Sequence, residues 1–316
     1  MLEMSDCQLA YNVQNDLKLL LDRALEAVQK YDRDAITPII RNFHEVRIAL
    51  QDEASFQLAQ ALVQGHQIFP LLLEDPYTYH AFTKPRGFAG DASLIDLFYG
   101  HRSGSEAKTE NGRFVFETLM RLPSCDSVRY RRGYYGAFID RIAERSQPKV
   151  LALACGHLRE ALFSRAVTDN AVRLIGIDSD PLAVAEAQNS LRRESVEIRN
   201  ASVIDFIRRR AWGDTYDAIY SAGLFDYLDA RIGRKVVTTA FEALRPGGII
   251  SVANFLPTII EQGYMDIVMN WRLIYRTPED MLELAAEIPA DIAKITTWSD
   301  PFNSVVYLTI SKQEKS

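Results

Sequence analysis

The spacing of apolar residues divides the chain into two halves. From Leu9 to about Leu73, apolar residues recur every three or four positions, as in "LKLLLDRALEAV", and the alternation typical of strands is missing. This spacing predicts helices. From Lys149 onward, short β-rich runs alternate with helical segments. That alternation predicts parallel strands joined by right-handed crossovers, which is a Rossmann-like, doubly wound α/β sheet.

The same pattern gives the expected elements of the second half. We expect strands at Lys149–Ala154, Val172–Asp178, Val196–Arg199, Tyr216–Ser221 and Gly248–Asn254. We expect helices between them, near Arg159–Ala166, Pro181–Arg192, Ile204–Arg210 and Ile232–Leu244. The segments "ADIAKITTWSD" and "NSVVYLTISK", separated by the turn "DPFN", predict a C-terminal antiparallel hairpin on the otherwise parallel sheet.

The segment between the halves, "EDPYTYHAFTKPRGFAGDASLIDLFYG", is rich in proline, glycine and aromatic residues. Because proline and glycine interrupt long helices, we expect an ordered loop that ends in a short helix at Ser93–Phe98. Two further helices are expected, around Gly112–Arg121 and Tyr130–Arg145.

Size and charge narrow the range of functions. The chain has 316 residues, enough for two domains, and we expect a helical cap or lid at 1–146 and an α/β domain at 147–316. Its net charge is −6 and it lacks a basic cluster interleaved with aromatic residues, which argues against a nucleic-acid partner. It has no apolar segment of membrane-spanning length and no export-signal pattern, so we expect a cytoplasmic protein without a membrane partner. The cysteines, Cys7, Cys125 and Cys155, lack the spacing of a zinc site, and no metal is expected.

The loop after the first strand of the α/β half is the first candidate for a ligand site. In a doubly wound sheet, ligands bind beyond the carboxyl ends of the strands, normally beside the first strand, and this places "ACGHL" at the site. Only Gly156 remains of the several glycines in a dinucleotide-binding fingerprint, and His157, Leu158 and Arg159 would crowd a pyrophosphate. We therefore expect a nucleoside-like ligand in place of a nicotinamide or flavin dinucleotide.

The second strand gives a stronger indication. It ends in Asp178, about 22 residues after Gly156, where a carboxylate can accept hydrogen bonds from both ribose hydroxyls. Asp180 is expected to cap the following helix, in which Pro181 would be the first residue.

The five strands, Asp178 and the turn "LRPGG" resemble the class I S-adenosylmethionine (SAM) dependent methyltransferase family over roughly Lys149–Leu256. The chain departs from the family where Ala152 replaces an acidic residue and "ACGHL" replaces a GxGxG loop. The segments "KPRGFAGDA" and "ACGHLREA" resemble a bacterial methyltransferase-like subgroup that includes fatty-acid methyl ester type proteins. Azetidine-2-carboxylate synthases also look like relatives.

This resemblance implies that SAM is bound, as methyl donor or as the only substrate. One expected reaction is methyl transfer to a small-molecule acceptor. The alternatives are cyclisation of SAM to azetidine-2-carboxylate and methylthioadenosine, as in secondary metabolism, and SAM binding without catalysis. Which of these occurs, and the oligomeric state, stay open.

The resemblance also implies a set of site residues. The expected cofactor contacts are Ala154, Gly156, His157, Arg159, Asp178, Asn200, Ser202 and Ser221. Aromatic faces can stabilise a sulfonium cation, and the candidates for this role are Tyr130, Tyr134, Phe225 and Tyr227. Simpler alternatives remain open: Asn200 and Ser202 as helix caps, the aromatic rings as core, and "KPRGFAGDA" as a structural clasp that joins the two halves in place of a lid.

Overall fold

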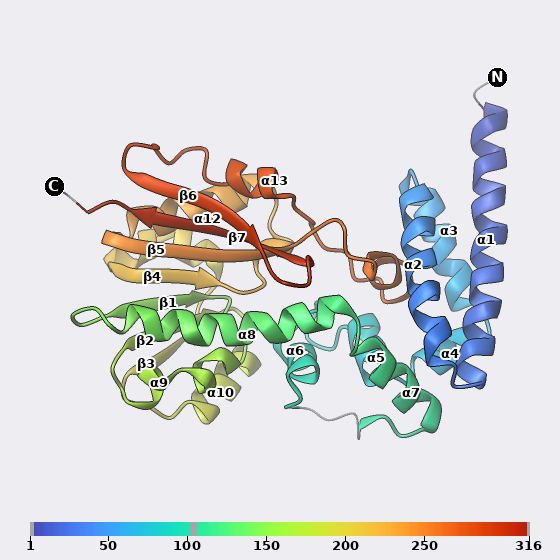
Figure 1. Ribbon diagram of the computed structural model, residues 1–316, viewed down its shortest axis with the longest axis horizontal. Coiled ribbons are helices and arrows are strands. Elements are labelled where there is room, and N and C mark those ends of the chain that lie inside the picture. The colour runs from blue at the N-terminus through green and yellow to red at the C-terminus, as the bar shows by residue number, and fades with distance from the viewer. Residues whose placement is uncertain (1–2, 102–105, 315–316) are drawn as a thin grey trace. The chain divides into compact units, whose positions relative to one another are not determined.

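The computed structural model in Figure 1 describes residues 3–101 and 106–314, with side chains from residue 14 onward. Cys7 therefore lies outside the described side chains. The chain forms two compact units. The first comprises Met1–Asp126 and Ile259–Arg272, and the second comprises Ser127–Thr258 and Leu273–Ser316.

The second unit is built on a seven-stranded sheet with the strand order β3-β2-β1-β4-β5-β7-β6. The parallel strands are β1 (Lys149–Leu153), β2 (Arg173–Asp178), β3 (Val196–Asn200), β4 (Tyr216–Ser221) and β5 (Leu244–Phe255). β7 (Val305–Lys312) runs antiparallel to β5 and to β6 (Ala293–Ser299). This confirms the predicted doubly wound sheet with a C-terminal hairpin. The strand order reverses between β1 and β4, which is where ligands bind in such sheets.

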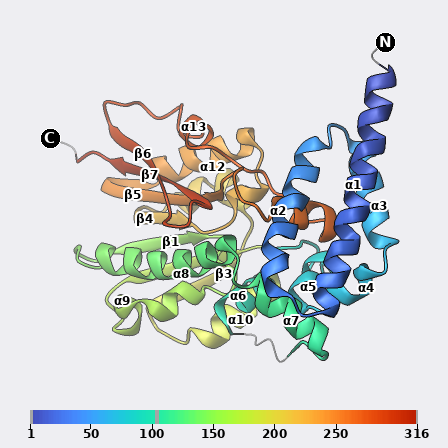
Figure 2. The same cartoon turned by 45° about the vertical axis from the view of Figure 1, so that its right-hand side comes forward.

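Helices cover both faces of this sheet (Figure 2). α11 (Val203–Arg208), α12 (Ala230–Glu242) and α13 (Pro278–Glu283) pack on the face that carries Leu151 and Ile219. α8 (Pro123–Ile142) contacts the opposite face through Tyr134 and Tyr135, which pack against Tyr307 and Tyr220. α10 (Pro181–Ser190) connects β2 to β3.

The predicted helix at 159–166 is wrong in type. Residues Arg159–Phe163 form a short 3-10 helix, and Ser164 caps a separate α9 (Arg165–Thr168). Leu158 precedes the 3-10 helix in a left-handed conformation, with φ of 51°.

The first unit is helical, as its apolar spacing predicts. Its helices are α1 (Glu3–Gln29), α2 (Arg33–Ala49), α3 (Glu53–Gln64), α4 (Ile68–Leu72), α5 (Pro76–Thr83), α6 (Ala92–Tyr99) and α7 (Glu110–Leu119). The presence of α5 shows that one prediction is wrong: the segment between the halves was expected to be a loop with a helix only at its end. Asp75 caps this helix and Pro76 occupies its first turn, where proline needs no hydrogen-bond partner for its nitrogen. None of the helices among the described residues is long and apolar enough to cross a membrane.

Segment 259–272 follows β5 in the chain but folds into the first unit. It contains the π-helix Tyr264–Val268, whose five residues are all buried. Gly263 is required here, because a Cβ atom at this position would lie 2.1 Å from the backbone oxygen of Phe43 on α2. The sequence pattern did not predict that this segment leaves the α/β unit.

Candidate functional site

The loop after β1 has a left-handed backbone at three alternate positions, although only one of them is glycine. Ala154, Gly156 and Leu158 have φ angles of 48°, 53° and 51°. These alternate positions correspond in spacing to the glycines of a GxGxG loop. A left-handed conformation costs a residue with a side chain about 1–2 kcal/mol. The side chain of Leu158 is fully buried, so its packing opposes this cost.

Asp178 lies at the carboxyl end of β2, as predicted, and it contacts this loop. The backbone N–H of Gly156 donates to Oδ2 of Asp178 at 2.8 Å, and the N–H of Asp180 donates to Oδ1 at 2.9 Å. Burial raises the pKa of the Asp178 carboxyl, and the two N–H donors oppose that shift. A carboxylate oxygen can accept more than one hydrogen bond, so Asp178 keeps acceptor capacity for ribose hydroxyls.

The residues around this loop are held by contacts within the second unit. Asp180 caps α10, whose first residue is Pro181, and this confirms the predicted cap. Arg159 donates to Oε1 of Glu186 on α10 at 2.8 Å, so its anionic partner in this structure is a glutamate. His157 is buried beside Arg159.

The polar residues after β3 and β4 make structural contacts. Nδ2 of Asn200 donates to the carbonyl of Asp178 at 3.0 Å. Ser202 forms a capping box with Asp205 at the start of α11, which is the simpler of the two alternatives for this residue. Ser221 is fully buried and donates to the carbonyl of Leu153 at 2.9 Å, linking β4 to β1. Adenine contacts from Asn200 and Ser202 stay a prediction.

The structure does not bring the four aromatic candidates to one place. Phe225 is fully buried in the core between the sheet and α12. Tyr134 lies on the other face, where its ring centroid is 4.9 Å from that of Trp298 and its hydroxyl is 3.3 Å from Oγ of Ser251. Tyr130 contacts Phe302 in the turn between β6 and β7, and Tyr227 is 40% exposed.

Sequence reasoning missed a charged network after β4. Oδ1 of the buried Asp226 accepts the N–H of Phe255 at 2.7 Å. Burial raises the pKa of Asp226 to about 7, against the opposing charges of Arg131 and Arg276. Arg276 donates to Oδ1 of Asn254 at 2.7 Å. It also donates to the backbone carbonyls of Phe225 and Leu228, which precede and follow the pair Asp226–Tyr227. The network therefore fixes the loop after β4 against the end of β5.

The segment "KPRGFAGDA" is anchored within the first unit. Asp91 caps α6, and its Oδ2 lies 2.7 Å from Nε2 of His80 on α5. Lys84 ends α5 in a left-handed conformation, and Gly87 follows with φ of 92°. These contacts join α5 to α6 within the first unit, and they do not test the alternative of a clasp that joins the two halves. The prediction that the segment closes as a lid stays a prediction.

A comparison with protein families gives a match in the second unit, over the strands that carry the candidate site. Residues 150–248 match the family model described as a methyltransferase domain. This segment carries a methyltransferase-domain pattern. It covers β1 to β4, the loop Ala154–Leu158, Asp178 and the start of β5. The match extends over less than half of the chain.

Solved structures support the fold. A possible exported protein from Bordetella parapertussis is 18% identical, with a TM-score of 0.57, and the match covers 84% of this chain and 100% of that one. A methyltransferase-like protein from Thermobifida fusca is 17% identical, with a TM-score of 0.51, over 70% and 94% of the two chains. A comparison with curated protein sequences finds no significant match.

Proposed function

We propose that this protein is a SAM-dependent methyltransferase that acts on a small-molecule acceptor. One observation carries the proposal: the methyltransferase-domain pattern at 150–248 falls on the strand ends where Gly156 and Asp178 are in contact. That contact joins the turn and ribose positions expected for a nucleoside-like ligand in a doubly wound sheet.

The residues have distinct proposed roles. Asp178 accepts hydrogen bonds from the ribose hydroxyls, and the left-handed loop Ala154–Leu158 presents backbone to the methionine part of SAM. Asn200 is the last residue of β3 and Ser202 follows that strand, and both contact the adenine. The acceptor is placed in line with the methyl–sulfur bond, at about 3–3.5 Å from the methyl carbon. As the acceptor bonds to this carbon, the methyl–sulfur bond breaks and its electron pair goes to sulfur, which gives S-adenosylhomocysteine.

The test combines binding with product analysis. Isothermal titration calorimetry with SAM and S-adenosylhomocysteine measures binding, and incubation with SAM, with and without a panel of acceptors, is followed by mass spectrometry. The proposal expects S-adenosylhomocysteine only when an acceptor is present. Methylthioadenosine from SAM alone would replace the proposal with cyclisation to azetidine-2-carboxylate. Binding without any product across the panel would favour a SAM-binding protein without catalysis.

A further inference from the structure

The first unit carries an open groove that the proposed reaction does not use. We call it the α1–α2 groove, because the residues that line it come from these two helices. Its volume is about 300 Å³. Since a water molecule takes up about 30 Å³ of the liquid, the groove has room for several side chains of a partner.

Each wall of the groove is one face of a helix. On α1, the lining residues are Asp16, Leu19, Leu20 and Arg23. Residues separated by three, four and seven positions lie on one face of a helix, and the lining residues of α2 have the same spacing. Two such faces side by side form a groove into which the side chains of a third helix can pack.

The floor of the groove is apolar. Leu20 and Val46 are buried, whereas Leu19 is 51% exposed. A helix that packs into the groove covers Leu19 and removes its apolar surface from water, which favours association.

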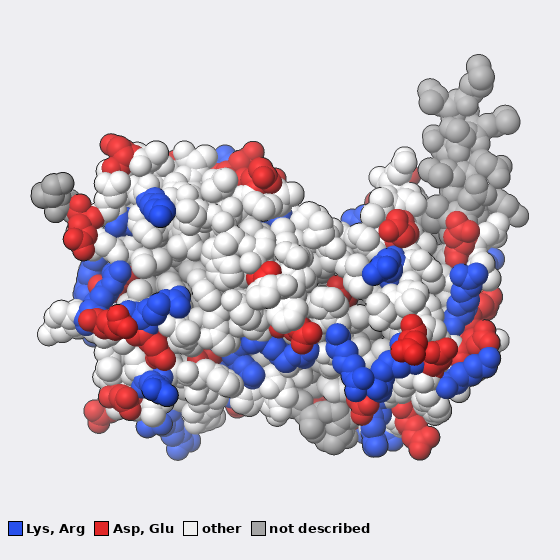
Figure 3. All heavy atoms as spheres, in the orientation of Figure 1, with Lys and Arg blue, Asp and Glu red and all other residues white. Residues whose placement is uncertain are grey.

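The charged residues of the groove are available to a partner. Asp16, Arg23 and Glu45 are exposed, and within the described part of the chain none of them has an ion-pair partner. On another face of α1, Oδ1 of Asp22 lies 3.1 Å from Nε2 of His66. Lysine and arginine side chains lie among acidic ones on the visible face of this unit in Figure 3. A partner with both signs of charge fits such a surface better than a partner with one sign.

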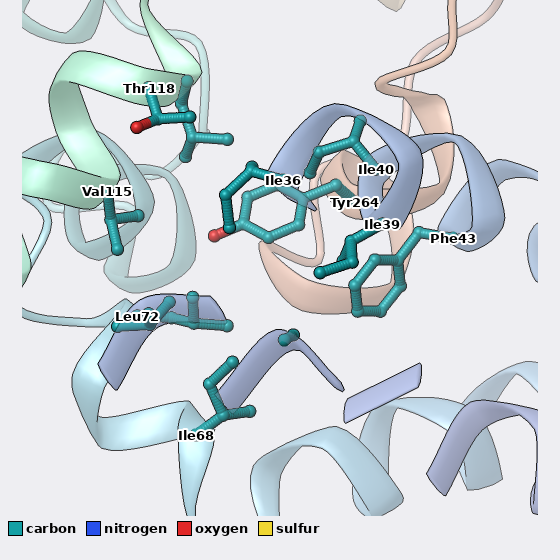
Figure 4. Close-up of a pocket in the computed structure, with 12 residues that line it drawn as sticks. Ile36, Ile39, Ile40, Phe43, Ile68, Leu72, Val115, Thr118 and Tyr264 are labelled. Atoms are coloured by element: carbon teal, nitrogen blue, oxygen red, sulfur yellow. The ribbon is translucent and has the colours of Figure 1, made fainter. Parts of the chain in front are cut away.

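Another hollow of the same unit is too small for a partner. Isoleucines of α2, together with Leu72 and Tyr264, line an apolar cavity (Figure 4). Its volume is about 20 Å³, which is room for one water-sized group. Of these two hollows, the α1–α2 groove is the one that a helix can enter.

The charges are arranged along the groove with the acids at one end. The connection between α1 and α2 is short, so the two helices run antiparallel. Asp16 lies about as far from this connection along α1 as Glu45 does along α2, and these two acids therefore share one end of the groove. Arg23 is closer to the connection and lies toward the other end.

We propose that the α1–α2 groove binds α1 of a second copy of this chain, which gives a dimer with two-fold symmetry. Asp16 lies three residues before Leu19, and Arg23 lies three residues after Leu20. A two-fold axis between the two leucines makes the paired α1 helices antiparallel and brings the leucines together at the centre. The same axis places Asp16 of one copy opposite Arg23 of the other, at both ends of the contact.

The sequence of α1 is thus complementary to itself in this orientation, and Glu45 adds a second acid to the end that receives the arginine. The inference does not depend on SAM use, because every residue that carries it belongs to the first unit.

Sedimentation equilibrium of the full-length protein, over a series of concentrations, tests the proposal. The wild-type protein is expected to show a monomer–dimer equilibrium. Arg23→Asp places like charges opposite each other at both ends, and it should raise the Kd of the dimer by about tenfold or more. Lys18→Asp is the matched control, because it changes the net charge equally on α1 but lies outside the groove, and it should leave the Kd unchanged.

A mixture of two variants separates lost pairing from lost folding. Asp16→Arg and Arg23→Asp should each dimerise weakly alone, but an equimolar mixture pairs opposite charges at both ends and should recover the dimer. A wild-type protein that stays monomeric over the whole series would overturn the proposal. A dimer with the same Kd in the wild-type protein and in Arg23→Asp would also overturn it, because the contact would then lie elsewhere.

Discussion

In the second unit, Asp226 is buried beside the charges of Arg131 and Arg276, whereas in the first unit Glu261 is buried among acids and phenols. The first arrangement is internally compensated, and it fixes the loop after β4 without a ligand. In the second arrangement, the groups that oppose the raised pKa of Glu261 are hydrogen-bond donors, and none is a basic side chain among the described residues. Burial without a counter-charge favours the neutral form of a carboxyl, so the two units hold their buried acids in different ways.

The largest expected effect breaks the compensated network. Arg276→Met should lower the free energy of unfolding by about 3–5 kcal/mol, because it leaves Asp226 with less opposing charge and leaves buried acceptors without their donor. Glu261→Gln should change the free energy of unfolding little, because burial already favours the uncharged form of this carboxyl. Urea unfolding followed by circular dichroism compares the two variants. Similar losses in both would contradict the distinction between the units.

A pH series separates the contribution of Asp226. Its pKa is raised from 3.8 to about 7 in the folded state, so the folded protein binds the proton more tightly than the unfolded chain. The resulting stability is fully present below about pH 4 and is lost as the pH rises through 7. The change attributable to this group is on the order of 4 kcal/mol, since each pKa unit corresponds to about 1.4 kcal/mol.

The matched variant for this series is Asp226→Asn. It can still accept the N–H of Phe255 but does not titrate. The difference in unfolding free energy between the wild-type protein and this variant should therefore vary across pH 4–7. For Asp75→Asn, the difference in unfolding free energy from the wild-type protein should stop changing near pH 6, because the pKa of Asp75 is raised only to about 6. A pH-independent difference for Asp226→Asn would show that this carboxyl does not titrate in the window.

The order of strands could be predicted from the sequence because each strand and crossover helix has its own local pattern. The placement of Gly156 and Asp178 at the carboxyl ends of the first two strands could be predicted as well, because each strand has its own apolar pattern, but the hydrogen bond between them was not predicted. Long-range charge pairing could not: Arg276 is 51 residues from Phe225, and no local spacing indicates their contact. The path of segment 259–272 was missed for the same reason, because its packing on α2 depends on a close backbone approach at Gly263.

The left-handed loop was missed for a different reason. The absence of glycine at Ala154 and Leu158 suggested a changed loop, but φ at both positions remains positive. Tertiary packing can hold a residue in a conformation that its intrinsic preference opposes. Sequence alone therefore showed the departure from the family pattern and not the left-handed backbone of the loop.

A smaller effect tests the proposed cofactor contact. Asp178→Ala should weaken SAM binding by about 1.5–3 kcal/mol, the range for hydrogen bonds to a charged group. Asp75→Asn should leave SAM affinity unchanged, because Asp75 belongs to the first unit and is engaged by donors of α5. Titration calorimetry on folded variants measures both. Wild-type SAM affinity in Asp178→Ala would remove Asp178 from the cofactor site.

The smallest effect compares left-handed residues that carry side chains in the two units. Ala154 has φ of 48° in the loop after β1, and Lys84 has φ of 49° at the end of α5. Glycine removes the crowding between Cβ and the backbone in this conformation, but it also increases the freedom of the unfolded chain. We expect Ala154→Gly and Lys84→Gly each to raise the free energy of unfolding by less than about 1 kcal/mol. Ala154→Gly should also alter SAM affinity, since Ala154 lies in the proposed cofactor loop. Urea unfolding and SAM titration of both variants provide the measurement.

A loss of stability in Ala154→Gly would mean that the methyl group of Ala154 contributes more through packing than the left-handed backbone costs. The loop would then be held by its side chains at this position as well as at Leu158.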